Sequence, residues 1–277
     1  MSLNIAEFRG FVYFFAAKSK GIYILITFVI TMCTLTVCSR KNDDETPPSE
    51  NPNLPVADNL AKADELFKQR EDIEKLREAR KLIAAVRQPD HRNFDVEWKF
   101  AKLSLFLGDK LTDDDQKEKT FEEGRDAGKI ASRIQPDKPD GFFWYGANLA
   151  ELAKLSPITV GLTSLDDIRE AMNTVIRLQP DYQGASAYDI LAQVELNTLM
   201  SGGKAPKAEE YLQKAIALEK NNSNLRLHLA QAYLDDDKLD LAKQQLEYIV
   251  KMQPDPEYLP EHKENVIEAK KLLASRF

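Results

Sequence analysis

Three histidines, two cysteines and two runs of aspartate are the residues here whose types could bind a metal or carry catalysis. His91, His228 and His262 have no further histidine or cysteine at metal-ligand spacing. The aspartate runs at residues 113–115 and 235–237 lack the alternating ligands and the glycine of a calcium-binding loop. No phosphate-binding loop, zinc motif or serine-nucleophile motif occurs either. We therefore expect no metal, no cofactor and no enzymatic activity, and we expect solvated turns at both aspartate runs.

The charge of the chain bears on its partners. The formal net charge is −7, and lysine and arginine form no stripe that could follow a phosphate backbone. We expect no nucleic-acid binding.

Residues 21–37 form an uncharged hydrophobic segment that follows Arg9, Lys18 and Lys20. Its length is at the lower limit for crossing a bilayer and slightly long for a signal-peptide core. Positive residues before such a segment keep the N-terminus inside. We expect the rest of the chain to lie outside the inner membrane, on the periplasmic side of a bacterial cell envelope.

The segment ends in Leu-Thr-Val-Cys, which resembles the signal box of bacterial lipoproteins, although Val37 stands where a small residue is expected. The resemblance implies cleavage before Cys38 and lipidation of its thiol. An uncleaved signal anchor and simple secretion remain as alternatives. We divide the chain into a targeting segment (1–38), a flexible linker rich in Asp, Glu, Pro and Asn (39–57) and a helical domain (58–277).

The domain is predicted to be all-helical, because apolar residues recur with a 3.6-residue period and no alternating strand pattern occurs. The tripeptide Gln-Pro-Asp recurs after predicted helices at Pro89, Pro136, Pro180 and Pro254, and Lys220 occupies an equivalent position. The successive spacings are 47, 44, 40 and 34 residues. Proline ends each helix, and the aspartate is predicted to cap the next one.

The last spacing marks the most regular unit, residues 222–255, which resembles the tetratricopeptide repeat (TPR) of 34 residues. Signature positions hold Leu229, Ala230, Tyr233, Ala242, Leu246 and Ile249. The resemblance implies a solenoid of about five helical hairpins, closed by a capping helix over residues 261–275. Three residues depart from the signature: Arg226 replaces an aromatic residue, Lys102 a small one and Glu195 a large one.

Measured against this repeat, the second and third hairpins contain about ten extra residues each, near 108–116 and 155–164. We expect both insertions to be loops on one rim of the solenoid, with Thr112 or Asp113 capping the helix after the first. The second insertion is apolar, so it either packs back on the solenoid or covers a ligand. The four aromatic residues 142–145 cannot all face one core. Phe142 and Tyr145 match packing positions, and Phe143 and Trp144 are expected to point toward the neighbouring hairpin, the apolar insertion or a ligand, with ordinary core packing as the default.

In TPR proteins, positions two, five, nine and twelve of each first helix line the concave surface. Carried to this sequence, the resemblance implies a lining by Val96, Lys99, Leu103, Phe106, Asp140, Phe143, Ala147, Ala150, Ser186, Asp189, Gln193, Leu196, Asn224, Leu227, Gln231 and Leu234. Our predicted binding residues combine part of this set with the aromatic run and the apolar insertion: Lys99, Leu103, Phe143, Trp144, Ala147, Ile158, Val160, Asp189, Gln193, Leu227 and Gln231.

A narrower resemblance covers residues 141–255, where the aromatic helix, the apolar insertion and a Gly-Gly before the helix KAEEYLQKAIAL are similar to TRAP-transporter-associated, TPR-containing lipoproteins (the T component). That family helps to deliver small organic ligands to a periplasmic binding protein. We predict a tethered, non-catalytic scaffold that binds a protein partner, such as an extracytoplasmic binding protein or a membrane complex, on its concave face. The alternative is a ligand-binding accessory with an apolar pocket near residues 142–164.

Overall fold

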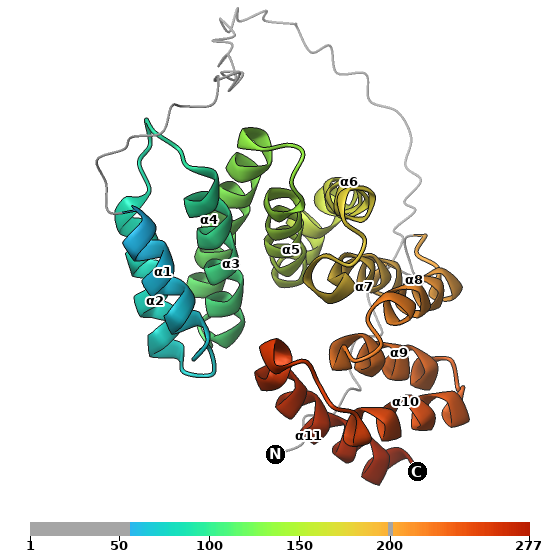
Figure 1. Cartoon of the computed structure of the whole chain (residues 1–277). Coiled ribbons are helices and arrows are strands. Elements are labelled where there is room, and N and C mark those ends of the chain that lie inside the picture. The colour runs from blue at the N-terminus through green and yellow to red at the C-terminus, as the bar shows by residue number, and fades with distance from the viewer. Residues whose placement is uncertain (1–55, 199–201) are drawn as a thin grey trace, which may run out of the picture. The chain divides into compact units, whose positions relative to one another are not determined.

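The computed structural model describes residues 56–198 and 202–277, which all belong to one of the chain's two compact units, Glu45–Phe277. Within these residues every regular element is a helix (Figure 1). The predictions for the hydrophobic segment, for Cys38 and for the linker up to residue 55 lie outside the described residues. The elements are α1 Val56–Phe67, α2 Ile73–Val86, α3 Phe94–Lys110, α4 Asp114–Ile134, α5 Pro139–Leu155, the π-helix η1 Pro157–Gly161, α6 Leu162–Leu178, α7 Tyr182–Asn197, α8 Ala205–Leu218, α9 Ser223–Asp235, α10 Leu239–Lys251, the 3-10 helix η3 Pro256–Tyr258 and α11 Leu259–Arg276.

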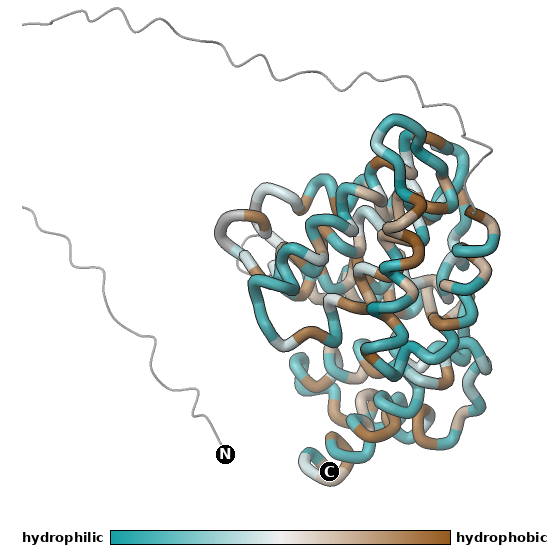
Figure 2. Tube along the Cα trace, turned by 90° about the vertical axis from the view of Figure 1, so that its left-hand side faces the viewer, coloured by the Kyte–Doolittle hydropathy of each residue, from teal (hydrophilic) through white to brown (hydrophobic). Residues whose placement is uncertain are grey.

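Consecutive helices pair into hairpins, α1 with α2 through α9 with α10, and each hairpin packs on the next. The predicted all-α arrangement of five hairpins is confirmed. Helix α11 packs on α9 and α10 at the end of the array, as expected for a capping helix. Hydrophobic and hydrophilic residues are mixed along the trace (Figure 2). Helices such as α2 and α10 bury one stripe against their neighbours, whereas α9 is buried on almost all sides. No described helix combines the length and the apolar character needed to cross a membrane.

The signature positions of the most regular hairpin form its core. Leu229 and Tyr233 of α9 are 3% and 6% exposed, and Ala242, Leu246 and Ile249 of α10 are fully buried. Burial of each of the larger side chains among them stabilises the fold by about 1.5–3 kcal/mol. The repeat period therefore identified core positions correctly.

Two residues that depart from the signature have buried polar partners. The guanidinium of Arg226 lies 3.6 Å from the ring centroid of Tyr248 and donates to the carbonyl of Lys220 at 2.9 Å. The carboxylate of Glu195 accepts the backbone N–H of Lys204 at 3.0 Å and lies 3.6 Å from Arg169. Both departures are thus explained within the fold, because each buried polar group is satisfied.

The proline stops end their helices as predicted, but the predicted aspartate caps are mostly wrong. Only Asp255 accepts a backbone N–H of the next helix, from Glu257 in η3. Helix α3 is capped by Asn93 instead, and α5 begins with Pro139, two residues after the aspartate of its stop. Proline is favoured at this first helical position because its φ is already helical and it has no N–H to satisfy.

The two predicted insertion loops are also wrong, because both stretches are helical. In the second hairpin the extra residues lengthen α3 and α4, leaving three residues between them, and Asp113 caps α4 by accepting the N–H of Gln116 at 2.9 Å. In the third hairpin the π-helix η1 joins α5 directly to α6, and the N–H of Gly161 donates to the carbonyl of Ser156 at 3.0 Å. Longer hairpins, and not loops on a rim, absorb the additional residues.

Close packing fixes the second hairpin against the third. A Cβ on Gly128 of α4 would lie 2.4 Å from the backbone nitrogen of Tyr145, and a Cβ on Gly141 of α5 would lie 2.2 Å from that of Ser132. Only glycine allows the backbones of α4 and α5 to approach so closely.

The last elements return to the first hairpin. Arg70, in the turn between α1 and α2, donates to both carboxylate oxygens of Glu261 at 2.7 Å and to the carbonyl of Glu257. Lys263 pairs with Glu71 at 3.2 Å beside it. The first and the last helices of the described part are therefore joined by ion pairs, which a simple stack of repeats does not provide.

Candidate functional site

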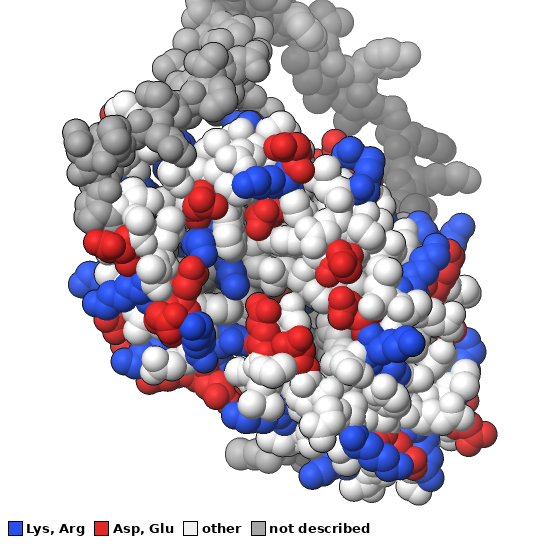
Figure 3. All heavy atoms as spheres, in the orientation of Figure 1, with Lys and Arg blue, Asp and Glu red and all other residues white. Residues whose placement is uncertain are grey.

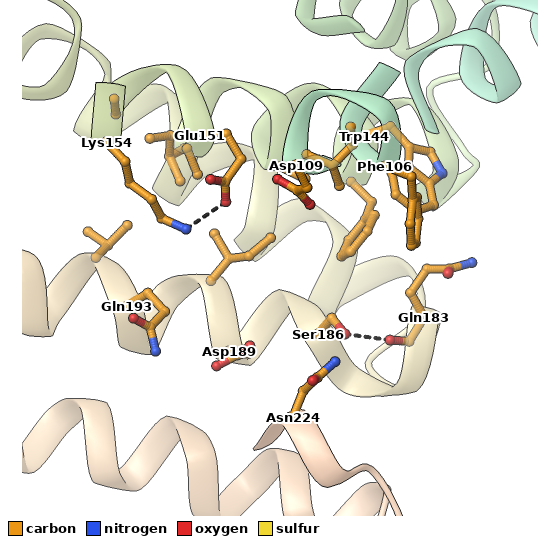
Figure 4. A pocket seen from close by; sticks show the side chains of 18 of the residues that line it. Phe106, Asp109, Trp144, Glu151, Lys154, Gln183, Ser186, Asp189, Gln193 and Asn224 are labelled. Carbon is orange, nitrogen blue, oxygen red and sulfur yellow. Dashed lines mark hydrogen bonds and ion pairs between the residues drawn. The ribbon is translucent and has the colours of Figure 1, made fainter. Parts of the chain in front are cut away.

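A pocket of about 730 Å³ lies among the first helices of hairpins two to five. Helices α3, α5, α7 and α9 each present side chains to it, while the end of α1 and the turn after it, η1, α6, η3 and the start of α11 complete its wall. Acidic side chains gather around the middle of the face shown in Figure 3, and Figure 4 shows the interior. The apolar part of the lining comprises Phe67, Leu105, Phe106, Phe143, Trp144, Ala147, Ala150, Ala153, Pro157, Leu165, Ile168, Ile190 and Val194.

Helix α3 presents Lys102, Leu105, Phe106 and Asp109 to the pocket. These residues are spaced i, i+3, i+4 and i+7, so they form one stripe along the helix. The ammonium of Lys102 lies 3.9 Å from the ring centroid of Phe67. Among the described residues, no carboxylate lies within ion-pair distance of it, and burial lowers the pKa of Lys102 to about 8.

The acid at the other end of this stripe, Asp109, is accessible from the pocket. The side chain of Asp109 is exposed overall, but the surrounding helices remove part of the water around its carboxyl group, and this, followed by the charge of Glu151, raises the pKa of Asp109 to about 7. No cation among the described residues pairs with it. Glu151 itself is neutralised by Lys154, whose ammonium lies 2.6 Å away on the same helix (Figure 4). The stripe of α3 therefore carries a lysine and a carboxyl group, neither of them in an ion pair with another described residue, with two apolar residues between them.

Helix α5 supplies the aromatic side of the pocket. The rings of Phe143 and Trp144 meet edge to face at 4.8 Å, and Phe143 meets Tyr182 in the same way at 5.4 Å. The exposed fractions of Phe143 and Trp144 are only 4% and 2%. Both residues therefore pack in the core, and both also line the pocket; Phe143 in addition reaches the neighbouring hairpin through Tyr182. Phe142 and Tyr145, which were expected at the packing positions, are only half-buried.

Helices α7 and α9 form the opposite wall. The imidazole of His228 lies 2.7 Å from the carboxylate of Asp189. Burial lowers the pKa of His228, but the charge of Asp189 and its hydrogen bond to the imidazole together outweigh burial, so the pKa is raised overall. At the start of α7, Gln183 and Ala185 have φ of 49° and 61°, on either side of Gly184 at 63°. This left-handed turn is strained for the two non-glycine residues, and it places Gln183 in the pocket wall.

The predicted binding residues divide into those that line this pocket and those that do not. Phe143, Trp144, Ala147, Asp189 and Gln193 line it. The others lie elsewhere: Lys99 pairs with Asp64 at 2.7 Å, Leu103 and Leu227 are buried in the core, Val160 packs against the core, Gln231 is exposed, and the side chain of Ile158 is not described. Of the TPR positions on α3 and α9, Phe106 and Asn224 line the pocket, and the remaining pocket residues of these two helices are Lys102, Leu105, Asp109 and His228.

Apart from Asp189, sequence reasoning missed the charged side chains and the histidine of the pocket, namely Arg70, Lys102, Asp109, Glu151, Lys154, His228, Glu257 and Glu261. One of them carried a signal. Lys102 occupies a position that is small in the repeat signature, and a lysine there is accommodated only because the pocket opens beside it. Nothing in the spacing of the remaining residues distinguishes them from solvent-exposed charges.

The pocket holds no arrangement for metal or nucleophilic chemistry. Among the described residues, no three histidine, cysteine or carboxylate side chains come together as metal ligands. The only histidine in the lining pairs with a carboxylate, with no serine or cysteine in hydrogen-bond contact among the described interactions. What the arrangement can do is to enclose a partly apolar molecule and contact its charged groups.

Comparison with known proteins agrees with this architecture. The profile of the tetratricopeptide repeat matches residues 199–259. The chain contains tetratricopeptide repeats. A second profile, of the regulator of microtubule dynamics proteins 1-3, matches residues 59–188 of this TPR chain. No curated protein matches the sequence of this chain.

Two solved structures of other proteins align with most of this chain. The thermophilic TPR protein TTC0263 from Thermus thermophilus is 19% identical with a TM-score of 0.58, over 78% of this chain and 98% of that one. A MamA RS-1 ArsTM double mutant is 14% identical with a TM-score of 0.44, over 79% and 99%. At this identity the first of these supports the fold alone.

Proposed function

We propose that this TPR protein is a non-catalytic binding protein that holds a small, partly apolar ligand in its central pocket. The observation that carries the proposal is the pocket itself. Its volume of about 730 Å³ falls within the usual range of about 300–1,000 Å³ for small-molecule sites. Its lining is mainly aromatic and aliphatic with a few charged groups, which is the usual composition of such sites. It lies beside η1, where the sequence favoured a ligand-binding alternative.

Filling the pocket tests this proposal. Ala150 lines the pocket and is only half-buried, so a tryptophan at this position would project into the pocket volume. Ala84 is exposed on α2 and is not part of the lining, so Ala84→Trp is the matched control. The fluorescent dye 1-anilino-8-naphthalenesulfonate should bind the wild type and Ala84→Trp equally, and Ala150→Trp at least tenfold more weakly. Equal binding by all three proteins would remove the pocket as the binding site.

The setting that we propose is the bacterial cell envelope, with the domain tethered by the N-terminal segment. The uncharged residues 21–37 and the cysteine that follows them support this proposal. Such a tethered ligand-binding solenoid is similar in organisation to the T-component lipoproteins, and its partner would then be an extracytoplasmic binding protein. Labelling of cells with a tagged fatty acid should mark the wild type but not Cys38→Ala; label on neither protein would favour an uncleaved anchor or secretion.

A second candidate function, a scaffold for a protein partner, is favoured by one observation. Among the described residues, all the exposed large hydrophobic side chains lie between residues 218 and 277, namely Leu218, Leu239, Leu241, Tyr248, Val250, Leu259, Ile267 and Phe277. These residues come from the C-terminal helices, and exposed apolar residues that gather on one surface often indicate a protein interface. Leu241→Glu and Ile267→Glu should abolish capture of a membrane partner without changing dye binding. Capture that survives both substitutions would exclude this surface.

A further inference from the structure

The charges that line the pocket differ in whether the protein itself neutralises them. Glu151 has Lys154, Asp189 has His228, and Glu261 has Arg70, each within hydrogen-bond distance. Lys102 and Asp109 have no such partner among the described residues. Glu257, exposed on η3 at the edge of the pocket, attracts Lys102 only from beyond ion-pair distance.

Lys102 differs in its partners from the two other residues that depart from the repeat signature. Arg226 and Glu195 break the signature too, but both are satisfied by hydrogen bonds and charges within the fold. The ammonium of Lys102 instead lies near the faces of two aromatic rings, 3.9 Å from the centroid of Phe67 and 5.9 Å from that of Trp144. A partly desolvated charge without a counter-ion is unfavourable, and a ligand of opposite charge would relieve it.

Resting on the ligand-binding function proposed above, we propose that the pocket selects a zwitterion: a small molecule with a carboxylate at one end, an ammonium at the other and an apolar body between them. The carboxylate pairs with Lys102, the ammonium with Asp109, and the body lies on Leu105 and Phe106. Removal of water is the first cause of both pKa shifts, and it is consistent with charged groups that a ligand would contact inside the pocket.

The geometry of α3 gives the length of the ligand. Lys102 and Asp109 are seven residues apart, which is about 10 Å along a helix at about 1.5 Å per residue. An extended chain of about eight bonds of about 1.5 Å spans a similar length, as in 8-aminooctanoate. A peptide of about three residues, at about 3.4 Å per residue, has its two free ends at the same separation. An amino acid such as 8-aminooctanoate and a peptide of this length therefore present the same two charged groups at the same separation.

Calorimetric titration of the folded protein with matched probes tests the inference. We expect 8-aminooctanoate to bind at least tenfold more tightly than octanoate, octylamine or the short zwitterion 4-aminobutanoate. Lys102→Met should lose this advantage and weaken octanoate while leaving octylamine unchanged. Asp109→Asn should weaken octylamine and leave octanoate unchanged. Lys99→Met is the control, because Lys99 pairs with Asp64 outside the pocket.

The outcomes separate the inference from the function on which it rests. If octanoate binds as tightly as 8-aminooctanoate, or if neither substitution changes the preference, the zwitterion assignment is wrong, even where the dye still enters the pocket. If Ala150→Trp does not weaken the dye, the pocket function itself fails. A tripeptide of alanine, phenylalanine and alanine that binds more tightly than 8-aminooctanoate, and loses affinity on N-acetylation and on C-amidation, would support the inference and identify a peptide as the source.

Discussion

The ion pair between Arg70, after α1, and Glu261, in α11, leads to a quantitative prediction about the stability of the fold. The side chains of Arg70 and Glu261 are only 7% and 23% exposed, and two N–H···O bonds of 2.7 Å join them. Arg70→Met would leave the carboxylate of Glu261 without its cation in a mostly buried site. Removal of one partner from a buried pair costs about 3–5 kcal/mol, and the residual exposure of Glu261 points to about 3 kcal/mol, at the lower end.

A neighbouring pair supplies the control. Lys263 and Glu71 join the same two elements at 3.2 Å, but their side chains are 55% and 56% exposed. Exposed pairs contribute about 0–1 kcal/mol, so Lys263→Met should have almost no effect on stability.

Urea denaturation followed by circular dichroism would measure both variants, and hydrogen exchange would report opening of residues 256–262. We expect the free energy of unfolding to fall by about 3 kcal/mol in Arg70→Met, with faster exchange in that segment. A loss of less than about 1 kcal/mol, together with unchanged hydrogen exchange, would refute the reasoning. It would mean that water solvates the Arg70–Glu261 pair as fully as it solvates the Lys263–Glu71 pair.

Three further predictions concern the core and the pocket. Trp144→Ala should lower the free energy of unfolding by about 3–5 kcal/mol, since this residue is 2% exposed, and the half-buried Trp98 is the comparison in the same urea experiment. Glu97→Gln should destabilise by about 3–5 kcal/mol, because its fully buried carboxylate is shared by Arg87 and Arg92; an unchanged midpoint would show that the pair is solvated. The pKa of Asp109, raised to about 7, means that the folded state keeps a proton that the unfolded state loses near pH 4. Stability should therefore fall as pH rises from about 4 to about 7, and thermal denaturation of Asp109→Asn should show less of this fall.

How far the sequence predicted the fold depended on whether a residue packs against a neighbouring helix or faces the pocket. Core positions such as Leu246 were predictable because the repeat period places them on a buried stripe. The extents of α3 and α4 were not, since the repeat length suggested a loop where continued packing, for example of Phe121 against Gly108, lengthens both helices. The aspartate caps were wrong because a proline further along the chain defined the start of α5.

The pocket was only partly predictable. Phe143, Ala147 and Asp189 followed from the TPR positions, because α5 and α7 present the expected stripe. Helix α3 presents Lys102 and Asp109 instead of Lys99 and Leu103, a rotation that no local pattern specifies. The contribution of α11 could not be foreseen, since it depends on contacts such as that of Arg70 with Glu261, which are distant in sequence.

The glycines between the second and the third hairpins have a consequence for what the pocket can accept. In a solenoid the step between neighbouring repeats sets the curvature of the whole array. Gly128 and Gly141 make this step unusually short, and the two hairpins that they join carry α3 and α5, which form adjacent walls of the pocket. A methyl group at either glycine would push α4 and α5 apart and change the separation of those walls. The width of the binding site is therefore controlled in part by two positions without side chains, neither of which lines the pocket.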